Sequence, residues 1–439
     1  MAATIVLFTR DLRVHDNPAL TAACREADQV VPMFVLDADL LARVGRAPNR
    51  LRFLSSALRE LDDELEGRGG RLVVRHGRVA DEIQRTVVEV GADTVHIATD
   101  VTHYGRRRER ILRERLSAIG CSLRGHGGSI TAVEPGAVRP DTGRGHYAVF
   151  TPYFRRWLDT PMRRPLTPPV TVRVPDVASE PIPDAADFGS GSPQLAVGGE
   201  TTGRKLLEWW LSGPVTQYAQ DKDVPAADGT SGLSPYLHFG CLSAAEVVSR
   251  TDASDPGGLA FIRQLAWRDF YHQVLADEPR AAFADYKPAL RPWRSDSHAV
   301  AAWRSGLTGY PMVDAGMRQL LLQGWMPGRA RLIAASFLVK TLRVDWRIGA
   351  EHFERWLVDA DIANNRLNWQ WMAGTGTDTH SSRVLNPLRQ AERFDPHGEY
   401  VRRWLPELAH VPGAEIHRPW RAGVPAKDYP PPIVEFNGM

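Results

Sequence analysis

The sequence has few cysteines and no long apolar run. Its three cysteines, Cys24, Cys121 and Cys241, are dispersed and odd in number, which argues against a disulfide framework and gives no metal-binding spacing. No segment has the pattern of a membrane span or a signal peptide, so we expect a cytoplasmic protein. Neither a metal nor a membrane is an expected partner.

Lysine is also scarce. Only five of the 54 basic residues are lysine, so arginine carries nearly all of the positive charge. The formal net charge of +2 argues neither for nor against nucleic acid. Arginine can hold a phosphate through two hydrogen bonds. A genome of high GC content produces the same bias without a functional cause, and we favour this explanation.

The first 126 residues have no GxGxxG motif after their first apolar run, which argues against a standard dinucleotide site. They alternate short apolar runs with amphipathic stretches. The apolar runs predict buried parallel strands at 4–9, 29–36, 72–75 and 94–98, and the periodicity predicts a helix over 51–67. This alternation predicts a doubly wound, Rossmann-like α/β sheet.

The remaining chain changes character twice. Residues 127–200 are rich in Pro, Gly and Ser with weak periodicity, which predicts a long linker. From 201 to 439 helical periodicity dominates, and 12 of the 13 tryptophans lie there. A chain of 439 residues suits two domains. We therefore predict an α/β domain over 1–126, a linker over 127–200 and an all-α domain over 201–439.

Residues 359–379, DADIANNRLNWQWMAGTGTDT, concentrate polar and aromatic side chains. The segment carries two carboxylates, an amide pair and two tryptophans: Asp359, Asp361, Asn364, Asn365, Trp369 and Trp371. A loop of small residues follows, where backbone can approach a ligand closely. An amide-rich cradle beside an aromatic wall suits a large flat heterocycle. The alternative is a core helix that happens to carry aromatics.

This string resembles the flavin-binding signature of the DNA photolyase/cryptochrome family. The opening FTRDLRVHDNPAL at 8–20 is similar to the family's N-terminal signature. The resemblance covers the whole chain and is closest to the bacterial class I cyclobutane pyrimidine dimer photolyases. It implies an antenna-binding α/β domain, a helical FAD-binding catalytic domain and FAD as the cofactor.

Several further segments match the family's flavin site. The resemblance implies that hydroxyls and backbone N–H groups hold the FAD phosphates at Tyr218, Thr230, Ser231, Leu233 and Ser234. It assigns other FAD contacts to Phe261, Gln264, Arg268, Arg331, Asp359, Asp361 and Asn365. In the family an arginine at the position of Arg331 pairs with the acid at Asp359, and Asn365 faces N5 of the ring. Photolyases carry Asn here, whereas cryptochromes usually carry Asp or Cys.

Three tryptophans match the relay that carries electrons to the excited flavin. They are Trp369, Trp346 in VDWRIG and Trp293 in RPWRSD. Any one of them is more often a core residue, but three at matching positions favour the relay. Together with Asn365 they are the predicted catalytic residues.

The N-terminal domain of many relatives holds an antenna pigment. Asp37, Arg50 and Asp100 stand at positions that contact a deazaflavin in some relatives. A polar cleft at strand ends is also normal for this kind of sheet, whatever it binds. We expect an 8-hydroxy-5-deazaflavin, with a folate or an empty pocket as alternatives.

The expected substrate pocket departs from the family pattern. The resemblance assigns it to Gln264, Trp267, Gly328, Arg329, Leu332 and Trp371, with the two tryptophans stacking on a flipped pyrimidine pair. Gln264 replaces a glutamate, Gly328 an asparagine and Leu332 a methionine. Pro327 replaces a common histidine. Gly232 replaces the arginine of a phosphate-binding motif, for which Lys222 or Arg204 could compensate.

These observations predict a deoxyribodipyrimidine photolyase, a carbon–carbon lyase in which light drives an electron from reduced FAD into cyclobutane pyrimidine dimers. The alternatives are a cryptochrome-like photoreceptor without repair activity and a flavin photoenzyme for a small non-DNA substrate. The histidine pair of (6-4) photolyases is missing from WMPGR, so that activity is not expected. We expect a monomer that joins the nucleoid on damaged DNA. Six arginines could border the DNA groove: Arg155, Arg156, Arg294, Arg343, Arg389 and Arg393.

Overall fold

The computed structural model describes residues 3–44, 47–377, 384–421 and 428–435. The chain forms two compact units, each built from separate stretches of sequence. The first unit contains Met1–Gly191, Val197–Gly213 and Ser231–Pro279, and the second contains Ser192–Ala196, Pro214–Thr230 and Arg280–Met439. The predicted domain boundaries at residues 126 and 200 stay predictions.

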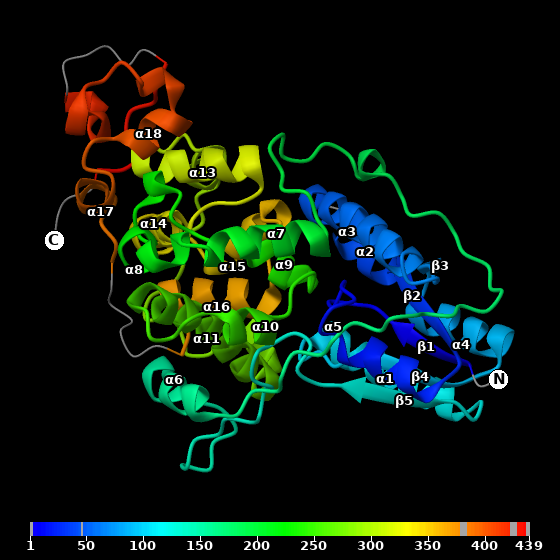
Figure 1. Cartoon of the computed structure of the whole chain (residues 1–439). Coiled ribbons are helices and arrows are strands. Elements are labelled where there is room, and N and C mark those ends of the chain that lie inside the picture. Colours follow the sequence, from blue (N-terminus) through cyan, green and yellow to red (C-terminus); the bar gives the residue numbers. More distant parts are fainter. Residues whose placement is uncertain (1–2, 45–46, 378–383, 422–427, 436–439) are drawn as a thin grey trace. The chain divides into compact units, whose positions relative to one another are not determined.

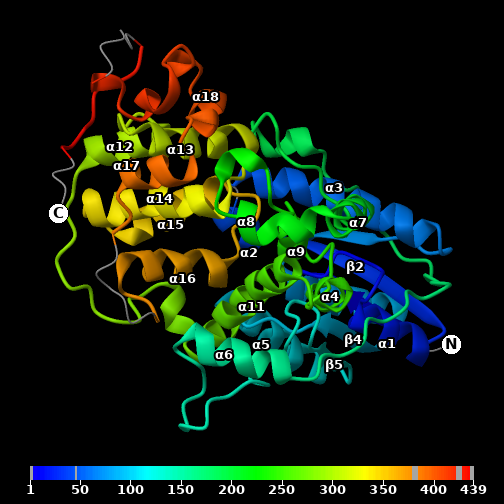
Figure 2. The ribbon, with the colours of Figure 1, turned by 60° about the vertical axis from the view of Figure 1, so that its left-hand side comes forward.

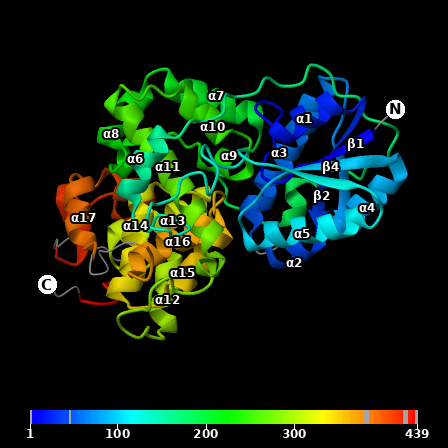
Figure 3. The same ribbon diagram turned by 90° about the horizontal axis from the view of Figure 1, so that it is seen from below.

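The first unit is built on a five-stranded parallel sheet (Figure 1). Its strands lie in the order β3-β2-β1-β4-β5, and they span Ala3–Leu7 (β1), Gln29–Asp37 (β2), Val73–Gly77 (β3), Ala92–Ala98 (β4) and Ser122–His126 (β5). The connecting helices are α1 (Pro18–Glu26), α2 (Ala38–Val44), α3 (Pro48–Glu66), α4 (Val79–Val90) and α5 (His103–Ser117). Figure 3 shows α1 and α3 on one face of the sheet and α4 and α5 on the other. The predicted doubly wound sheet is confirmed.

One strand, β5, escaped the prediction. It pairs with β4 at the edge of the sheet, and its residues Ser122, Arg124 and Gly125 are exposed. The sequence SLRGH therefore has no apolar run that would mark it as a strand. The inner strand β1, in contrast, is buried along its whole length, which is why apolar runs found the inner strands.

The Pro- and Gly-rich segment after the sheet packs closely against it. Val30 donates its N–H to the carbonyl of Arg173 (2.8 Å), and Glu180 donates its N–H to that of Val74 (2.9 Å). Within this segment α6 (Phe150–Asp159) lies beside α11 (Pro256–Asp277), where Figure 2 shows the two helices together. The helices that complete the first unit are α7 (Glu200–Leu211), α9 (Ser234–Phe239) and α10 (Ala244–Arg250).

Two buried residues of the opening signature segment, Arg13 and Asp16, form a group with buried Ser243 and half-buried Arg163. We call these four residues the closed cluster. The Arg13 side chain donates from Nη1 to the carbonyl of Gly240 (2.9 Å) and from Nη2 to those of Asp16 (2.9 Å) and Ser129 (3.1 Å). Asp16 accepts from Arg163 and from the hydroxyl of Ser243. Burial alone would raise the pKa of Asp16, but these bonds outweigh it and hold the pKa below its ordinary value. The signature thus ties the loop after β1 to the chain around residue 240.

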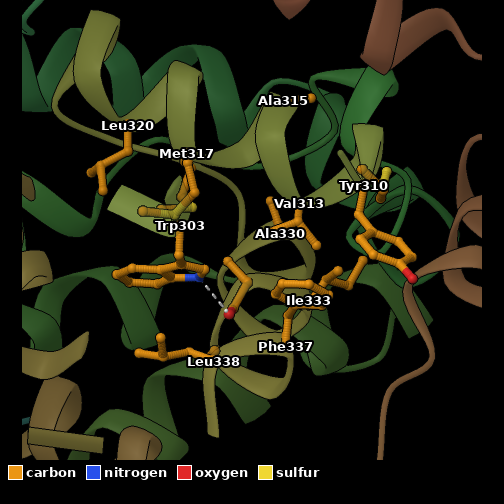
Figure 4. Close-up of a cluster of buried hydrophobic side chains, with 14 of the residues drawn as sticks. Trp303, Tyr310, Val313, Ala315, Met317, Leu320, Ala330, Ile333, Phe337 and Leu338 are labelled. Atoms are coloured by element: carbon orange, nitrogen blue, oxygen red, sulfur yellow. Dashed lines mark hydrogen bonds between the residues drawn. The ribbon is translucent and has the colours of Figure 1, made fainter. Parts of the chain in front are cut away.

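The second unit is helical. It contains α8 (Tyr218–Asp221), α12 (Ser297–Ser305), α13 (Pro311–Gln323), α14 (Gly328–Ser336), α15 (Trp346–Trp356), α16 (Ile362–Ala373), α17 (Pro387–Phe394) and α18 (Glu399–Trp404). A π-helical turn, η5 (Phe337–Thr341), follows α14. Figure 4 shows the core around Trp303, whose indole donates to the carbonyl of Ala334 (3.0 Å). None of the helices described is both long enough and apolar enough to span a bilayer.

Short 3₁₀ turns connect the longer helices in both units. They are η1 (Ala185–Phe188), η2 (Pro214–Gln217), η3 (Pro225–Ala227), η4 (Pro279–Ala282), η6 (Pro406–Leu408), η7 (Gly413–His417) and η8 (Pro419–Arg421).

Candidate flavin site

The signature string 359–379 folds around α16. Asp361 caps the helix, because its Oδ1 accepts from the backbone N–H and the side-chain amide of Asn364, each at 2.9 Å. Gly374 ends it with a φ of 85°. The buried side of α16 carries polar residues as well as apolar ones, so its position depends on the partners of those polar groups. Asp378 and Thr379 lie outside the described residues.

Gln370 fixes α16 to the chain that precedes α12. Its side chain is fully buried. Its Oε1 accepts from the N–H of Tyr286 (2.8 Å), and its Nε2 donates to the carbonyls of Ala281 (2.6 Å) and Ala284 (3.1 Å). The glutamine in the Trp-Gln-Trp string is therefore a structural anchor, a role that the sequence did not reveal because its partners lie more than 80 residues away.

Asn365 is a buried polar residue of α16 with one bonding group open. Its Nδ2 donates to the carbonyl of Ala350 (3.0 Å) and to Glu354 (3.2 Å). Both partners can only accept, which fixes the orientation of the amide. Among the described residues, none donates to Oδ1. An amide oxygen in a 9% exposed side chain is thus free to accept from a bound molecule.

Arg331 and Asp359 form the pair that the resemblance implied. The guanidinium holds both carboxylate oxygens, at 3.0 Å and 2.8 Å, and Nε donates to the carbonyl of Met326 (2.8 Å). The Asp359 side chain is only 3% exposed, whereas that of Arg331 is 26% exposed. The side chain of Arg331 therefore extends from α14 and neutralises Asp359, a buried acid just before α16. Such a pair places a fixed dipole next to the start of this helix.

Glu354 on α15 is a residue that the sequence analysis missed. Besides Asn365, it binds Arg366 through two contacts, at 2.5 Å and 2.7 Å. The bidentate pair sets the rotamer of Glu354, and Glu354 in turn holds the amide of Asn365. Its sequence context, GAEHFERW, gave no signal that it would face α16. Only the packing of α15 on α16 brings the groups together.

The three predicted relay tryptophans all belong to the core region of the second unit: Trp346 and Trp369 lie in its hydrophobic cluster and Trp293 packs against it. Trp369 on α16 packs so closely on α15 that a Cβ added at Gly349 would stand 2.2 Å from its ring. Trp346 lies three residues before Gly349 on α15, so it is on the same side of that helix. Trp346 is fully buried. Trp293 is half-buried, and the next residue, Arg294, donates its N–H to the carbonyl of Arg343 (2.7 Å), close to the start of α15.

Trp369 has mostly apolar neighbours. Its ring makes edge contacts with Phe353 (4.9 Å between centroids) and Trp303 (6.0 Å). Trp371, on the same helix, is half-buried against the core of the second unit.

In the first unit, α11 carries the other predicted flavin and substrate residues. Phe261 is buried, Gln264 is exposed, and Arg268 donates to the carbonyls of Ile130 (2.5 Å) and Leu237 (3.1 Å). The Trp267 ring stacks on Phe150 with 3.7 Å between centroids and 6° between planes. One face of this tryptophan is therefore covered by α6.

The predicted phosphate-binding residues lie on both sides of a boundary in the sequence, where the chain passes from the second unit to the first. Tyr218 and Thr230 belong to the second unit, and Ser231, Leu233 and Ser234 belong to the first. The Leu233 N–H donates to Ser231 Oγ at 3.3 Å. Gly232 has a φ of 63°, a conformation that costs a non-glycine residue about 1 kcal/mol. Glycine at position 232 therefore suits this turn.

The predicted antenna residues Asp37 and Asp100 lie at the carboxyl-terminal edge of the sheet, at the ends of β2 and β4. Asp37 accepts from the hydroxyl of Tyr104, and Asp100 lies 3.8 Å from a guanidinium nitrogen of Arg10. Burial raises the pKa of the Tyr104 hydroxyl, which stays protonated as a donor. Arg50 lies in the first turn of α3.

The predicted substrate residues of the second unit differ in the space around them and in the contacts they already make. Gly328 begins α14, and a Cβ added there would meet nothing within 4 Å. Arg329 is occupied, because it binds Asp223 (2.8 Å) and lies over the Phe394 ring at 4.2 Å. Leu332 is half-buried on the same helix.

The arginines proposed to border DNA are mostly exposed. Arg343 alone of the six is half-buried; Arg156 is held by Asp141 at 3.1 Å. Within the described ranges, no group of three or more His, Cys, Asp or Glu residues could hold a metal ion.

Comparison with known proteins agrees with the residues described above. A family model for the FAD binding domain of DNA photolyase matches residues 261–439, and a DNA photolyase model matches residues 4–172. A deoxyribodipyrimidine photo-lyase of Streptomyces griseus is 56% identical over 99% of this chain and 97% of its own length. That of Escherichia coli K12 is 36% identical, over 100% of this chain and 96% of its own length.

Two solved structures have the same fold over nearly the whole chain. A bacterial class III photolyase from Agrobacterium tumefaciens matches with a TM-score of 0.91 and 34% identity, covering 99% of this chain and 95% of its own. A cryptochrome of Synechocystis sp. PCC6803 matches with a TM-score of 0.92 and 31% identity, covering 99% and 97%. The chain belongs to the DNA photolyase/cryptochrome family. The predicted enzyme class, a photolyase with FAD as its cofactor, is confirmed.

Proposed function

We propose that this chain is a deoxyribodipyrimidine photolyase that uses light and reduced FAD to split cyclobutane pyrimidine dimers in DNA. The observation that carries the proposal is the fixed amide of Asn365, whose oxygen receives no hydrogen bond from the described residues. The N5–H group of a reduced flavin is a donor, so this amide suits the electron-donating state of the cofactor. A carboxylate at this position would instead repel negative charge on the ring.

The donor set of the second unit fits the flavin. Asn365 would accept from the ring, and the Arg331–Asp359 pair would supply a positive charge that is already oriented by a buried carboxylate. Asp361 and Asn364 hold the start of α16 in place. The resemblance assigns the phosphates to Tyr218 and Thr230 of this unit and to Ser231, Leu233 and Ser234 of the first. When bound, the FAD supplies the excited electron that opens the cyclobutane ring.

The relay tryptophans would return the flavin to its reduced state. Trp369 would lose one electron to the excited flavin, take one from Trp346, and Trp346 would take one from Trp293. Because Trp293 is half-buried while Trp346 is not exposed at all, an electron enters from the surface and moves inward. The apolar contacts of Trp369 with Phe353 and Trp303 hold its ring without adding charge next to it.

In the second unit, the dimer would be bound at the open start of α14. As the family resemblance implies, Trp267 and Trp371 would stack on the bases. Gly328 leaves room for the dimer but offers no side-chain hydrogen bond, and Gln264 offers a neutral one where relatives have a charge. We infer that affinity is weakened and the chemistry is retained, because these changes touch the substrate and not the Asn365 amide.

Within the family, we assign the chain to the class I enzymes with an 8-hydroxy-5-deazaflavin antenna. This class assignment rests on the sequence motifs. The fold does not distinguish the classes, because a solved class III photolyase shares it. The antenna would lie by Asp37, Arg50 and Asp100. Mass spectrometry of the chromophores released from purified protein tests this directly, and a folate or a missing second chromophore would contradict it.

The decisive experiment is repair of a thymine-dimer oligonucleotide by the purified, prereduced protein. We expect splitting in blue light, none in the dark, and binding that weakens as salt increases, because DNA contacts depend on phosphate charge. An undamaged oligonucleotide of the same sequence is the control for specific binding. We place this activity in the cytoplasm, on the nucleoid.

A blue-light photoreceptor is the second candidate, favoured by the substitutions at Pro327 and Gly328 and by the likeness to a cryptochrome structure. It predicts photoreduction of FAD without dimer splitting. Photoreduction without splitting, and without salt-dependent DNA binding, would instead indicate a photoenzyme for a small substrate.

A further inference from the structure

The middle tryptophan of the relay has an ionic partner. The indole nitrogen of Trp346 donates to Oδ1 of Asp285 at 2.8 Å. The Trp346 ring is fully buried, and the Asp285 side chain is 22% exposed. A carboxylate on an indole N–H stabilises positive charge on the ring, and a buried ring has no water to do so. The Trp369 ring, in contrast, makes its aromatic contacts with Phe353 and Trp303, which carry no charge.

The structure holds Asp285 in place from both sides. Arg347 on α15 donates to the same Asp285 oxygen at 2.8 Å and, through Nε, to the carbonyl of Phe283 at 3.0 Å. On the other side, Gln370 of α16 binds the carbonyl of Ala284 and the N–H of Tyr286. The residues before and after Asp285 are therefore pinned to the two helices that carry the relay, which keeps the carboxylate on the indole.

The charge of Arg347 does not cancel this effect. Its guanidinium lies over the Trp346 ring, with 4.7 Å from its central carbon to the ring centroid, which opposes positive charge on the ring. Arg347 is shared with a second acid, Asp345, at 3.1 Å. The Asp285 oxygen is closer to the ring system, at 2.8 Å from its nitrogen, and it is hydrogen-bonded to it. Of these two charged groups, the carboxylate is the one that is hydrogen-bonded to the indole.

We infer that Asp285 is a positioning residue of the relay, which favours the oxidised form of Trp346 and so draws the positive charge outward from Trp369. This inference rests on the proposed relay. In the step concerned, Trp369, already short of one electron, takes an electron from Trp346. No covalent bond breaks, and the indole proton stays on nitrogen in its bond to Asp285. Trp293 then returns one electron to Trp346, and an external thiol reductant replaces the electron lost by Trp293.

The experiment compares photoreduction of bound FAD in four single variants and one double variant under blue light with excess thiol. Asp285→Asn keeps an acceptor but removes its charge, and we expect photoreduction to slow on the order of ten-fold, the difference between a charged and a neutral acceptor. Asp285→Glu keeps the charge and should recover part of the rate. Asp345→Asn frees the same Arg347 without touching the indole, retains a good helix cap, and should slow the reaction much less.

The fourth variant separates this inference from the relay itself. Trp346→Phe should lose photoreduction, and adding Asp285→Asn to it should change nothing further. If Trp346→Phe photoreduced normally, the relay would be wrong. If Trp346→Phe failed but Asp285→Asn matched the wild type or Asp345→Asn, only the role of Asp285 would be overturned.

A measurement that needs no photochemistry checks the hydrogen bond. In protein with ¹⁵N-labelled tryptophan, the indole N–H signal of Trp346 is identified by its loss in Trp346→Phe. Asp285→Asn should move this signal toward the position of a weaker hydrogen bond, and Asp345→Asn should leave it in place. An unmoved signal in Asp285→Asn would show that the bond is absent in solution.

Discussion

The closed cluster of the first unit and the Asn365 site of the second unit are both polar and largely buried. They differ in whether every hydrogen-bonding group has a partner within the described residues. Arg13 directs Nε, Nη1 and Nη2 to backbone carbonyls, and its partner Asp16 is bonded on both oxygens. Asn365 has two bonds on its nitrogen, whereas its oxygen receives none from the described residues. A polar group whose bonds all close within the protein stabilises the fold. A group that is held rigidly with one bond left over is ready for a ligand.

The largest effect that would sharpen this comparison comes from Trp369, which lies one turn after Asn365 on α16. We expect Trp369→Phe to abolish photoreduction of oxidised FAD while costing only about 1–3 kcal/mol in the free energy of unfolding, as for other buried replacements. Absorption spectra under blue light measure the first, and urea unfolding the second. Trp404→Phe, also buried in the second unit, is the matched control. Unchanged photoreduction in Trp369→Phe would assign this tryptophan to packing alone.

The closed cluster should respond in the opposite way. Arg13→Met leaves three carbonyl groups without their donor, so we expect a loss of about 3–5 kcal/mol in the free energy of unfolding, measured in urea. Arg59→Met breaks the exposed pair of Arg59 with Asp184 and should cost about 0–1 kcal/mol. Both variants should bind FAD when folded. A cost for Arg13→Met no greater than for Arg59→Met would break the distinction between the two clusters.

A histidine pair should make the free energy of unfolding of the first unit depend on pH. His96 Nδ1 and His126 Nε2 lie 2.9 Å apart, and burial lowers both pKa values, that of His96 to about 4. The unfolded chain therefore binds more protons than the folded protein between about pH 6.5 and 4. We expect the free energy of unfolding to fall by about 1–3 kcal/mol as the pH falls through this range, and to be flat in this respect above it.

Urea unfolding at pH values from 4 to 8 measures this dependence. His96→Gln should flatten it, whereas the exposed His76→Gln should leave it unchanged. An equal slope in wild type and His96→Gln would assign the acid sensitivity to other groups.

The smallest expected effect concerns the substrate. Gly328→Asn restores a hydrogen bond worth about 0.5–1.5 kcal/mol, so we expect dimer-containing DNA to bind roughly two- to ten-fold more tightly, with unchanged photoreduction. Fluorescence anisotropy with a labelled oligonucleotide measures the affinity. Gly213→Asn, where an added Cβ also meets nothing within 4 Å, is the control. No gain in affinity would mean that the dimer does not reach the start of α14.

The features that could be predicted from the sequence are those that depend on a local pattern or on a rare string of residues. Apolar runs found the inner strands, and the string around Asn365 identified the family. The edge strand β5 was missed because exposed residues leave no such pattern. Glu354, Gln370 and Asp285 were missed because their roles depend on partners on other elements, which no local string encodes. The open space at Gly328 and the left-handed turn at Gly232 likewise became visible only in three dimensions.

The way the two units share the chain has a consequence for how the protein is made. The first unit lacks part of its structure until Ser231–Pro279 has left the ribosome, and by then Pro214–Thr230, which belongs to the second unit, has already emerged. Domains that are continuous in sequence can fold one after the other during synthesis. Here the early piece of the second unit must wait, unpartnered, for the 160 residues that begin at Arg280. We therefore expect the yield of folded protein to depend on translation speed around residues 214–280.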